Sequence, residues 1–472
     1  MIIRRKEEER ELLRAFESSE SEFVAVYGRR RVGKTFLVKN TFEGKFTFQH
    51  SGAANGDKQV QLAAWCQSLE EYGMTVDSAP SNWMDAFQLL RQLIKESSQE
   101  KKVVFIDEMP WMDTPGSKFT TALEFFWNSF ASMRKDVLLI VCGSAASWII
   151  NKLFRNYGGL YNRVRYQIYL RPFTLHECEE YAKSMDLQFT RYDILEAYMI
   201  LGGIPYYWSL LQKGQSLAGN IDRLFFKKNG KLSNEFNILY DSLFRRPEIY
   251  VKIVTVLGEH KSGLTRNEII SKAGLQDNGG TSRALEDLEH SDFISRYHNF
   301  STKKNDAIFR LSDNLSLFYF KFIKENVNND EHFWSSVYNT STRLAWTGLA
   351  FERVCFQHIR QIKEGLGIRG VVTNVLSCRT KGKDGGREVQ IDMLIDRADN
   401  VVNLCEMKFS AGPFSISKDY DMELRRKITR FYDTTGTKKA VHLTLITPYG
   451  VEHNMYWNIV QSEVVADDLF KE

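Results

Sequence analysis

A glycine-rich loop directly after a short apolar run is the feature that most constrains this chain. The apolar run Phe23–Tyr27 stops at the loop Gly28–Thr35, whose sequence GRRRVGKT matches the phosphate-binding pattern GxxxxGK[ST]. A helix is expected to begin near Gly33. Backbone N–H groups of such a loop and of the following helix N-terminus can surround phosphate oxygens. A chance loop rich in Gly and Arg is the alternative, and the next motif makes it the weaker one.

We expect the loop to bind ATP together with Mg²⁺. Lys34 would reach the β- and γ-phosphates, and the Thr35 hydroxyl would bind the metal. Arg29 to Arg31 can also be solvated or hold a partner surface. The residues predicted to bind the nucleotide in this segment are Gly28, Arg29, Arg30, Arg31, Val32, Gly33, Lys34, Thr35 and Phe36.

A second motif places two carboxylates after the apolar run Val103–Ile106. Ligands of parallel sheets bind at the carboxyl ends of the strands, which is where Asp107 and Glu108 follow. Asp107 is expected to hold Mg²⁺ through water, and Glu108 to orient and deprotonate the attacking water. The alternative is that both residues only start a turn before Pro110.

Two further side chains are candidates for the same site. Ser144 follows the apolar strand Val137–Cys142 and can sense the γ-phosphate or the lytic water, or else cap a helix, since Ser favours that position. Arg163 is expected to neutralise charge in the transition state, either in its own chain or on a neighbouring copy.

Length and composition limit the remaining possibilities. The 472 residues suggest two to four domains. With 63 Lys and Arg against 59 Asp and Glu, charge alone does not imply nucleic-acid binding. The six cysteines form no CxxC pair, and no apolar run approaches the roughly 20 residues that span a bilayer. The start of the chain lacks the apolar core of a signal peptide, so a cytoplasmic protein without a membrane segment is expected.

The pattern of elements predicts four domains. Alternating strands and helices predict a parallel α/β core at 1–170, and a mostly helical segment follows at 171–245. Three short helices and a strand pair suggest a winged helix-turn-helix at 246–332. The expected elements there are helices at Tyr250–Leu257, Leu264–Ala273 and Thr281–His290 and strands at Ile294–Phe300 and Ala307–Leu311.

Residues 333–472 are expected to form a separate α/β domain. A long helix should open it, followed by three strands, a helix and a strand. The predicted ranges are Thr342–Lys363, Gly370–Asn374, Val389–Asp396, Val402–Lys408, Asp419–Tyr432 and Ala440–Ile446.

The residues of the predicted winged helix argue both for and against DNA binding. The start of its third helix, Thr281–Leu285, would face a major groove, and Lys303 and Lys304 would lie in the wing. Phosphate affinity comes largely from Lys and Arg, and this helix is acidic, so an interdomain or partner module is an equal alternative. The acidic residues are Glu286, Asp287, Glu289 and Asp292.

The last domain carries its own set of candidate residues. Glu406 and Lys408 are two apart on a strand and therefore share a face. Asp392 and Glu406 are expected to bind Mg²⁺, Lys408 to position or polarise the attacking water, and Glu352 to complete the carboxylate set. The alternative is an internal salt bridge in a non-catalytic fold.

The whole pattern resembles the archaeal-type ATPases of the AAA+/STAND assemblage. The residues that carry the resemblance are YGRRRVGKT at 27–35, Ile106-Asp107-Glu108, Gly143-Ser144, Arg171-Pro172-Phe173 and LGGIPYY at 201–207. It implies an ASCE-type core, a helical lid, a winged helix and, often, a carboxyl-terminal domain similar to PD-(D/E)XK nucleases.

The resemblance also implies positions for two other segments. Arg4-Arg5-Lys6-Glu7 would lie near the adenine, and Gly202–Pro205 would form a tight helix junction facing the nucleotide, although a plain helix break explains the latter equally well.

Two functions follow as expectations. In the first, an ATPase controls a Mg²⁺-dependent nuclease-like domain acting on DNA. In the second, ATP drives a signalling or scaffold switch whose nuclease-like domain is non-catalytic and binds a protein partner. A second copy of the chain is a further expected partner.

Overall fold

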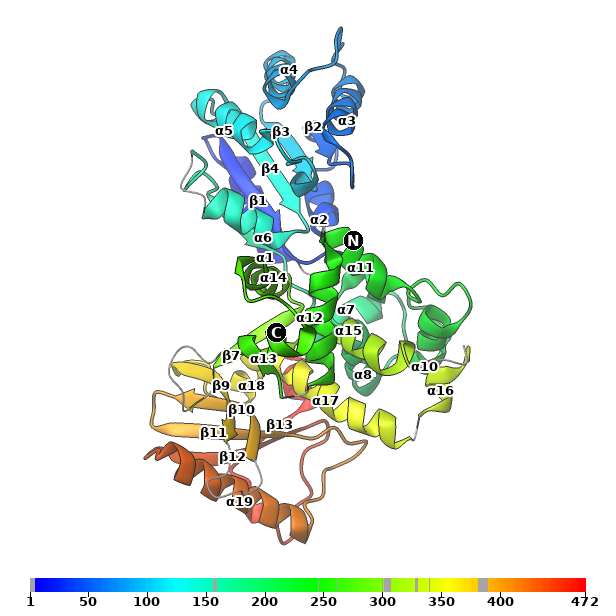
Figure 1. Cartoon of the computed structure of the whole chain (residues 1–472), viewed down its shortest axis with the longest axis vertical. Helices are drawn as coiled ribbons and strands as arrows, with labels where there is room; N and C mark the ends of the chain where they lie inside the picture. Colours follow the sequence, from blue (N-terminus) through cyan, green and yellow to red (C-terminus); the bar gives the residue numbers. More distant parts are fainter. Residues whose placement is uncertain are drawn as a thin grey trace. The chain divides into compact units, whose positions relative to one another are not determined.

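The computed structural model describes residues 5–155, 159–244, 246–260, 262–298, 300, 307–326, 330–338, 340–380 and 389–472. The chain divides into two compact units, Met1–Pro172 and Phe173–Glu472 (Figure 1). Within the described ranges, no helix combines the length and the apolar character needed to cross a membrane.

The first unit is built on a five-stranded sheet in the order β2-β3-β4-β1-β5. Every neighbouring pair of strands runs parallel, which confirms the parallel α/β core predicted from the alternating pattern. The strands are β1 (Glu22–Tyr27), β2 (Phe46–Ser51), β3 (Lys102–Asp107), β4 (Val137–Gly143) and β5 (Tyr166–Tyr169).

Helices cover both faces of this sheet, as the continuous apolar strands require. Alternate strand residues such as Phe23 and Ala25 belong to one core with α3 (Lys58–Glu71), α4 (Trp83–Glu96) and α5 (Phe119–Ser129). The intervening residues, such as Val24 and Val26, are also buried, and α1 packs on β1, β5 and α2. The remaining α-helices of this unit's described part are α1 (Lys6–Glu17), α2 (Lys34–Thr41) and the short α6 (Ala146–Ile149).

The second unit begins with helices and continues with a small antiparallel sheet in the order β6-β8-β7. The helices are α7 (Leu175–Ser184), α8 (Arg191–Leu201), α9 (Pro205–Trp208), α10 (Leu217–Ile221), α11 (Glu235–Leu243), α12 (Pro247–Glu259), α13 (Arg266–Ala273) and α14 (Gly279–His290). The strands are β6 (Leu264–Thr265), β7 (Ile294–His298) and β8 (Ala307–Leu311). The winged-helix assignment stays a prediction, and Lys303 and Lys304 fall outside the described residues.

A second five-stranded sheet, in the order β13-β12-β11-β10-β9, ends the chain. Strands β9 to β11 form an antiparallel meander, and α19 then crosses over so that β12 runs parallel to β11. The elements are α17 (Ser341–Gln357), α18 (Ile359–Gly365), β9 (Thr373–Thr380), β10 (Val389–Arg397), β11 (Val401–Met407), α19 (Lys418–Thr435), β12 (Ala440–Thr447) and β13 (Ser462–Val465).

Several expected boundaries were wrong for identifiable reasons. The helix expected from Leu264 begins at Arg266, because Leu264 and Thr265 pair with β8 and Thr265 caps the helix. The strand expected at Gly370–Asn374 begins only at Thr373.

The long helix expected at Thr342–Lys363 is broken at His358. This buried imidazole accepts a hydrogen bond from the Leu175 backbone N–H at 2.9 Å and donates one to the Val354 carbonyl at 2.8 Å. Burial lowers the pKa of His358 to about 4, so the ring is neutral and can accept and donate at once. One long-range contact, the hydrogen bond from Leu175, and one local contact to Val354 therefore hold the ring at the break, and helical spacing in the sequence does not reveal the long-range one.

Candidate functional site

The carboxyl edge of the first sheet brings the predicted nucleotide residues together. The loop Gly28–Thr35 follows β1, Asp107 is the last residue of β3, and Ser144 follows β4. Since all five strands are parallel, these ends meet at one edge, where ligands of open α/β sheets bind.

Two glycines shape the loop. Gly28 has a φ of +139°, and a Cβ there would lie 2.4 Å from the Leu170 carbonyl oxygen. Gly33 has a φ of +93° and caps α2. Glycine reaches such backbone angles without steric cost, so the loop can turn sharply beside β5 and leave the first N–H groups of α2 free of a side-chain cap.

Lys34 lies buried at the centre of the loop. Its ammonium group donates to the carbonyl oxygens of Gly28 at 3.0 Å and Arg29 at 2.8 Å, and to the Ser144 hydroxyl at 3.2 Å. The loop therefore curls around its own lysine, which links it to the end of β4.

The two carboxylates expected to act in catalysis join the same network. The Thr35 hydroxyl donates to Asp107 Oδ2 at 2.6 Å. Ser144 donates twice to Glu108, from its hydroxyl to Oε1 at 2.5 Å and from its backbone N–H to Oε2 at 3.2 Å. Glu108 itself has a left-handed backbone with a φ of +46°, a conformation that costs free energy and often occurs at functional sites.

Ser144 is not a helix cap in this structure. The capping position of the following helix α6 (Ala146–Ile149) belongs to Ala145, which makes no side-chain cap hydrogen bond. The Ser144 hydroxyl instead connects Lys34 with Glu108, in the place expected of a sensor.

The donor set fits Mg²⁺ and a polyphosphate. The Thr35 hydroxyl and the Asp107 carboxylate are oxygen donors in direct contact, and Mg²⁺ prefers such ligands. Lys34 supplies the positive charge for phosphate oxygens. The Asp107 carboxylate contacts the loop through Thr35, and the Glu108 carboxylate contacts Ser144. Their roles in metal binding and catalysis stay predictions.

The remaining loop residues differ in exposure. Arg29 and Val32 are buried, Arg30 and Arg31 are half-buried, and Phe36 is 54% exposed on the first turn of α2. Phe36 is thus accessible to a ligand, whereas Arg29 is held within the protein.

Arg5 approaches the same edge from α1. Its guanidinium donates to the Arg171 carbonyl at 2.5 Å, and the preceding Leu170 N–H donates to the Tyr27 carbonyl at 2.8 Å, directly before Gly28. The predicted proximity of the Arg5-Lys6-Glu7 segment to the adenine stays a prediction, and Arg4 falls outside the described residues.

Arg163 does not reach the phosphate edge of its own sheet. Arg165 donates its backbone N–H to the Phe23 carbonyl at the start of β1, so Arg163 lies at the amino-terminal edge, opposite to Gly28. Its predicted role in neutralising transition-state charge, in its own chain or on a neighbouring copy, stays a prediction. Arg171 follows β5 at the carboxyl edge, and its guanidinium lies 5.7 Å from the centre of the Tyr169 ring.

The carboxyl-terminal sheet forms a second cluster around Glu406. Lys408 lies 3.0 Å from Oε1 and Lys427 lies 2.9 Å from Oε2, and the Tyr420 hydroxyl donates to Oε1 at 2.7 Å. Burial alone would raise the pKa of Glu406, but the two ammonium groups and the tyrosine outweigh it and lower the pKa. Glu406 is therefore a paired carboxylate whose side chain is only 11% exposed.

Lys427 and Tyr420 were missed in the sequence. They lie seven residues apart on α19, which places them on one helix face. That spacing was a usable signal.

Strand register relates position 392 to this cluster. Met393 on β10 pairs with Cys405 on β11, and continuing the antiparallel register by one residue brings position 392 opposite Glu406. The side chain of Asp392 falls outside the described part. Among the described side chains, no group of three His, Cys, Asp or Glu is arranged to hold a metal ion.

Glu352 lies on α17, half-buried. The nearby Cys355 thiol has a raised pKa because of burial, with smaller effects from Glu352 and Cys405. Cys405 is adjacent to Glu406 and therefore on the opposite face of β11. The structure gives no described contact that brings Glu352 to Glu406, and its part in a metal site stays a prediction.

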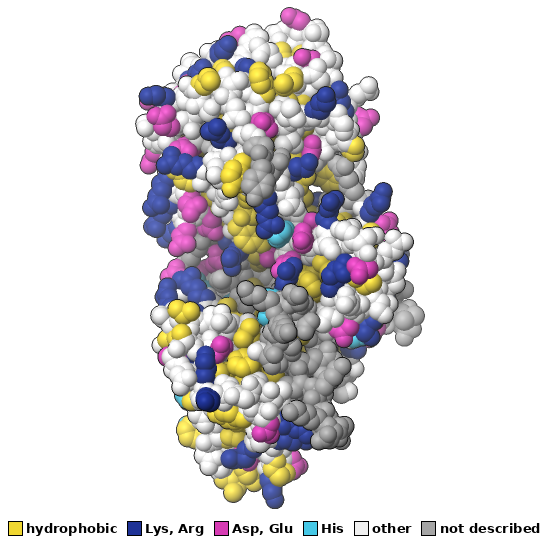
Figure 2. Space-filling view, turned by 60° about the vertical axis from the view of Figure 1, so that its left-hand side comes forward, with side chains coloured by type: hydrophobic (Ala, Val, Ile, Leu, Met, Phe, Trp, Pro, Cys, Tyr) yellow, Lys and Arg dark blue, Asp and Glu magenta, His cyan; other side chains and the backbone are white. Residues whose placement is uncertain are grey.

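Two acidic side chains of helix α14 contact other residues of the second unit. Asp287 accepts a hydrogen bond from the Tyr250 hydroxyl at 2.7 Å, and Glu289 pairs with Arg296 at 2.8 Å. Basic and acidic side chains are interspersed on the face shown in Figure 2. DNA contact by this segment stays a prediction.

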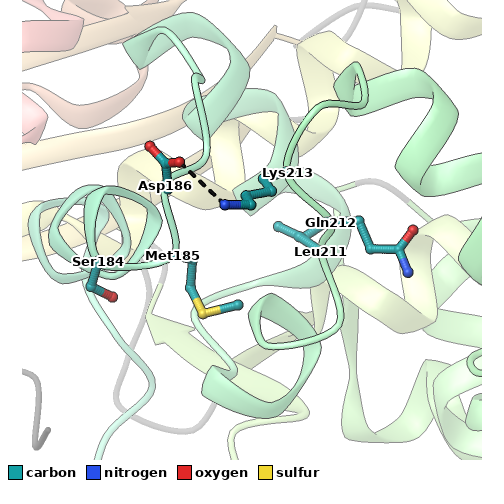
Figure 3. Close-up of a pocket in the computed structure, with 6 residues that line it drawn as sticks. All are labelled: Ser184, Met185, Asp186, Leu211, Gln212 and Lys213. Carbon is teal, nitrogen blue, oxygen red and sulfur yellow. Dashed lines mark ion pairs between the residues drawn. The ribbon is translucent and has the colours of Figure 1, made fainter.

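A surface hollow in the second unit shares no lining residue with either cluster. Ser184, Met185 and Asp186 line one side, and Leu211, Gln212 and Lys213 line the other (Figure 3). Its one ion pair, Lys213 with Asp186 at 3.6 Å, is exposed. An exposed pair of this kind contributes little free energy, so the hollow offers no catalytic arrangement.

Comparison with known proteins agrees with the first site. Residues 3–211 match a family described as an ATPase domain predominantly from Archaea. The chain contains an archaeal-type ATPase domain. An uncharacterized protein of Methanocaldococcus jannaschii is 24% identical over 332 residues, 70% of each chain. An uncharacterized ATP-binding protein of the same organism is 44% identical over 45 residues, 10% of this chain and 76% of that protein.

Solved structures show a looser likeness. A Walker-type ATPase of Pyrococcus abyssi is 17% identical with a TM-score of 0.46, over 68% of this chain and 96% of that one. The ORC2 protein of Aeropyrum pernix, in ADPNP–ADP complexes, is 15% identical with a TM-score of 0.42, over 71% and 95%.

Proposed function

We propose that this chain binds ATP with Mg²⁺ at the loop Gly28–Thr35 and hydrolyses it. One observation carries the proposal: Lys34, Ser144 and Glu108 form a continuous hydrogen-bonded chain across three strand ends, next to the Thr35–Asp107 pair. In this proposal Lys34 is the cation that binds phosphate, Ser144 the sensor and Glu108 the base. Thr35 and Asp107 are the pair that binds the metal.

The residues would divide the work as follows. Lys34 would exchange its carbonyl partners for phosphate oxygens, and Thr35 and Asp107 would hold Mg²⁺, which neutralises charge on the phosphates. Glu108 would accept a proton from the attacking water. Ser144 would release Glu108 when the γ-phosphate competes for its hydroxyl.

Replacing Lys34 by Ala tests the binding site. We expect affinity for a fluorescent ATP analogue to fall roughly 10- to 100-fold, because a hydrogen-bonded charge on the phosphates is lost. Lys39→Ala, on the exposed side of the same helix, should bind like the native chain. Unchanged affinity in a folded Lys34→Ala protein would contradict the proposal.

We further propose that the nucleotide state controls a Mg²⁺-dependent, nuclease-like activity of residues 333–472 on DNA. The order of a helix, three antiparallel strands, a crossover helix and a parallel strand supports it, as does the register of position 392 with Glu406. Mg²⁺ fits only if it replaces an ammonium group on Glu406. The ion pairs of Glu406 with Lys408 and Lys427 favour the second candidate, a non-catalytic domain that binds a protein partner under ATP control.

Plasmid cleavage separates the two candidates. With ATP and Mg²⁺, nicking by the native chain should fall about 100-fold or more in Asp392→Asn and Lys408→Ala, because each removes charge stabilisation at the phosphodiester. The exposed Lys438→Ala serves as the control. No nicking by the native chain in Mg²⁺ or Mn²⁺ would reject the nuclease and leave the partner-binding candidate.

A further inference from the structure

Aromatic rings from separate segments stack at the surface of the second unit. The ring centroids of Tyr192 and Phe409 are 5.0 Å apart, those of Tyr192 and Tyr449 are 5.8 Å apart, and in both pairs the planes differ by 20°. Phe351 of α17 packs on Phe409 at 5.6 Å. The stack of Phe409, Tyr192 and Tyr449 thus contacts the buried Phe351, whose plane is tilted by 47° against Phe409, and it ends at Tyr449, which is 48% exposed.

The backbone that carries Tyr449 is firmly held. Gly450 has a left-handed φ of +79°, and its carbonyl accepts from the Phe414 N–H at 2.9 Å. The Val451 N–H donates to Glu463 at 2.9 Å. An exposed aromatic ring on a fixed loop is already in place to bind, because little conformational freedom is left to lose.

The stack lies at the edge of the sheet that carries the Glu406 cluster. Phe409 directly follows Lys408, whose backbone N–H donates to the Ile446 carbonyl at 3.0 Å. Tyr449 comes two residues after the end of β12, which runs parallel to β11. Both ring-bearing segments therefore leave the sheet at the carboxyl end of β11, next to Lys408.

We propose that an unpaired nucleobase stacks on the exposed ring of Tyr449, so that this edge takes single-stranded or frayed nucleic acid. This inference rests on the proposed nucleic-acid function of residues 333–472. The rings of Tyr192 and Phe409 already stack on one side of Tyr449. Every nucleobase presents a flat face, so any base could extend this stack regardless of the nucleotide sequence. The bases of an intact duplex are covered by their neighbours and offer no such face.

Binding in EDTA tests the proposal separately from cleavage. The full chain is titrated into a fluorescein-labelled 20-nucleotide single strand and into the corresponding duplex. Tyr449→Ala should weaken single-strand binding about 5- to 150-fold and leave duplex binding unchanged. Tyr449→Phe should bind within about twofold of the native chain, because the stacking face remains. Met455→Ala removes a 78% exposed apolar side chain six residues further along the chain and should bind normally.

Failure of plasmid cleavage leaves the binding result standing, since EDTA removes the metal from both arms. The proposal is overturned if the native chain binds no single strand, if Tyr449→Ala weakens both nucleic acids equally, or if Tyr449→Phe loses as much as Tyr449→Ala. Should Tyr449→Ala fold poorly, Tyr449→Trp gives a second readout: its fluorescence is quenched by the bound strand, and an unquenched signal overturns the proposal.

Discussion

Glu108→Gln is expected to bind ATP within about threefold of the native chain while its turnover falls about 100-fold or more. Glutamine keeps the length of the side chain and can still accept from Ser144, whose hydroxyl and N–H both point at this group. It cannot take a proton from water. Binding and chemistry should therefore separate in this variant, unlike in Lys34→Ala, where binding itself is lost.

Phosphate release under saturating ATP measures the turnover, and the fluorescent analogue measures the binding. Glu96→Gln makes the same chemical change on the exposed end of α4 and should turn over ATP normally. If Glu108→Gln turned over ATP as fast as the native chain, another residue would have to be the base. Loss of binding in this variant would instead show that Glu108 mainly shapes the empty loop.

The arrangement of the predicted nucleotide-binding residues was largely readable from the sequence, because the segments that carry them are local. Glycines at fixed spacing and a helix beginning at Lys34 are set by a few neighbouring residues. The continuous apolar runs before Gly28, Asp107 and Ser144 predicted buried parallel strands, and parallel strands necessarily bring their ends together. What the sequence left open was the actual bonding, such as the contact of Ser144 with both Lys34 and Glu108.

The misses involve contacts between distant segments. Arg163 was chosen by residue type and its role stays a prediction, but the edge of the sheet where it lies follows from the register of β5 and not from the local sequence. Lys427 and Tyr420 meet Glu406 only after the α19 crossover is formed. Strand β13 has four residues, too few for a clear alternating pattern, and pairing with β12 stabilises it.

Arg343→Met is expected to destabilise the second unit by about 3–5 kcal/mol. Arg343 of α17 pairs with Glu196 of α8, and their side chains are only 4% and 8% exposed. The guanidinium also stacks on Trp334 at 4.0 Å and on Tyr338 at 4.3 Å. Methionine fills part of the space between the rings but leaves Glu196 buried without its counter-charge, and that uncompensated carboxylate is the main cost.

The loss should depend on pH, and its sign follows from Glu196. Burial raises the pKa of this carboxyl, and Arg343 partly opposes the rise. Without Arg343 the folded-state pKa rises further above the unfolded value of about 4.3. The folded variant then binds more protons than the unfolded one between these two pKa values, so its stability relative to the native chain falls as pH increases through that window. The deficit in unfolding midpoint should be larger at pH 7.5 than at pH 5.

A double variant separates charge from packing. Adding Glu196→Leu removes the stranded carboxylate, so most of the lost stability should return and the pH-dependent part of the deficit should disappear, because no titrating group is left at the site. Urea midpoints followed by tryptophan fluorescence, at both pH values and for all four proteins of the cycle, give the coupling between the two side chains. A deficit in Arg343→Met that is equal at both pH values and unchanged by Glu196→Leu would show that the stacking on Trp334 and Tyr338, rather than the buried charge, sets the cost.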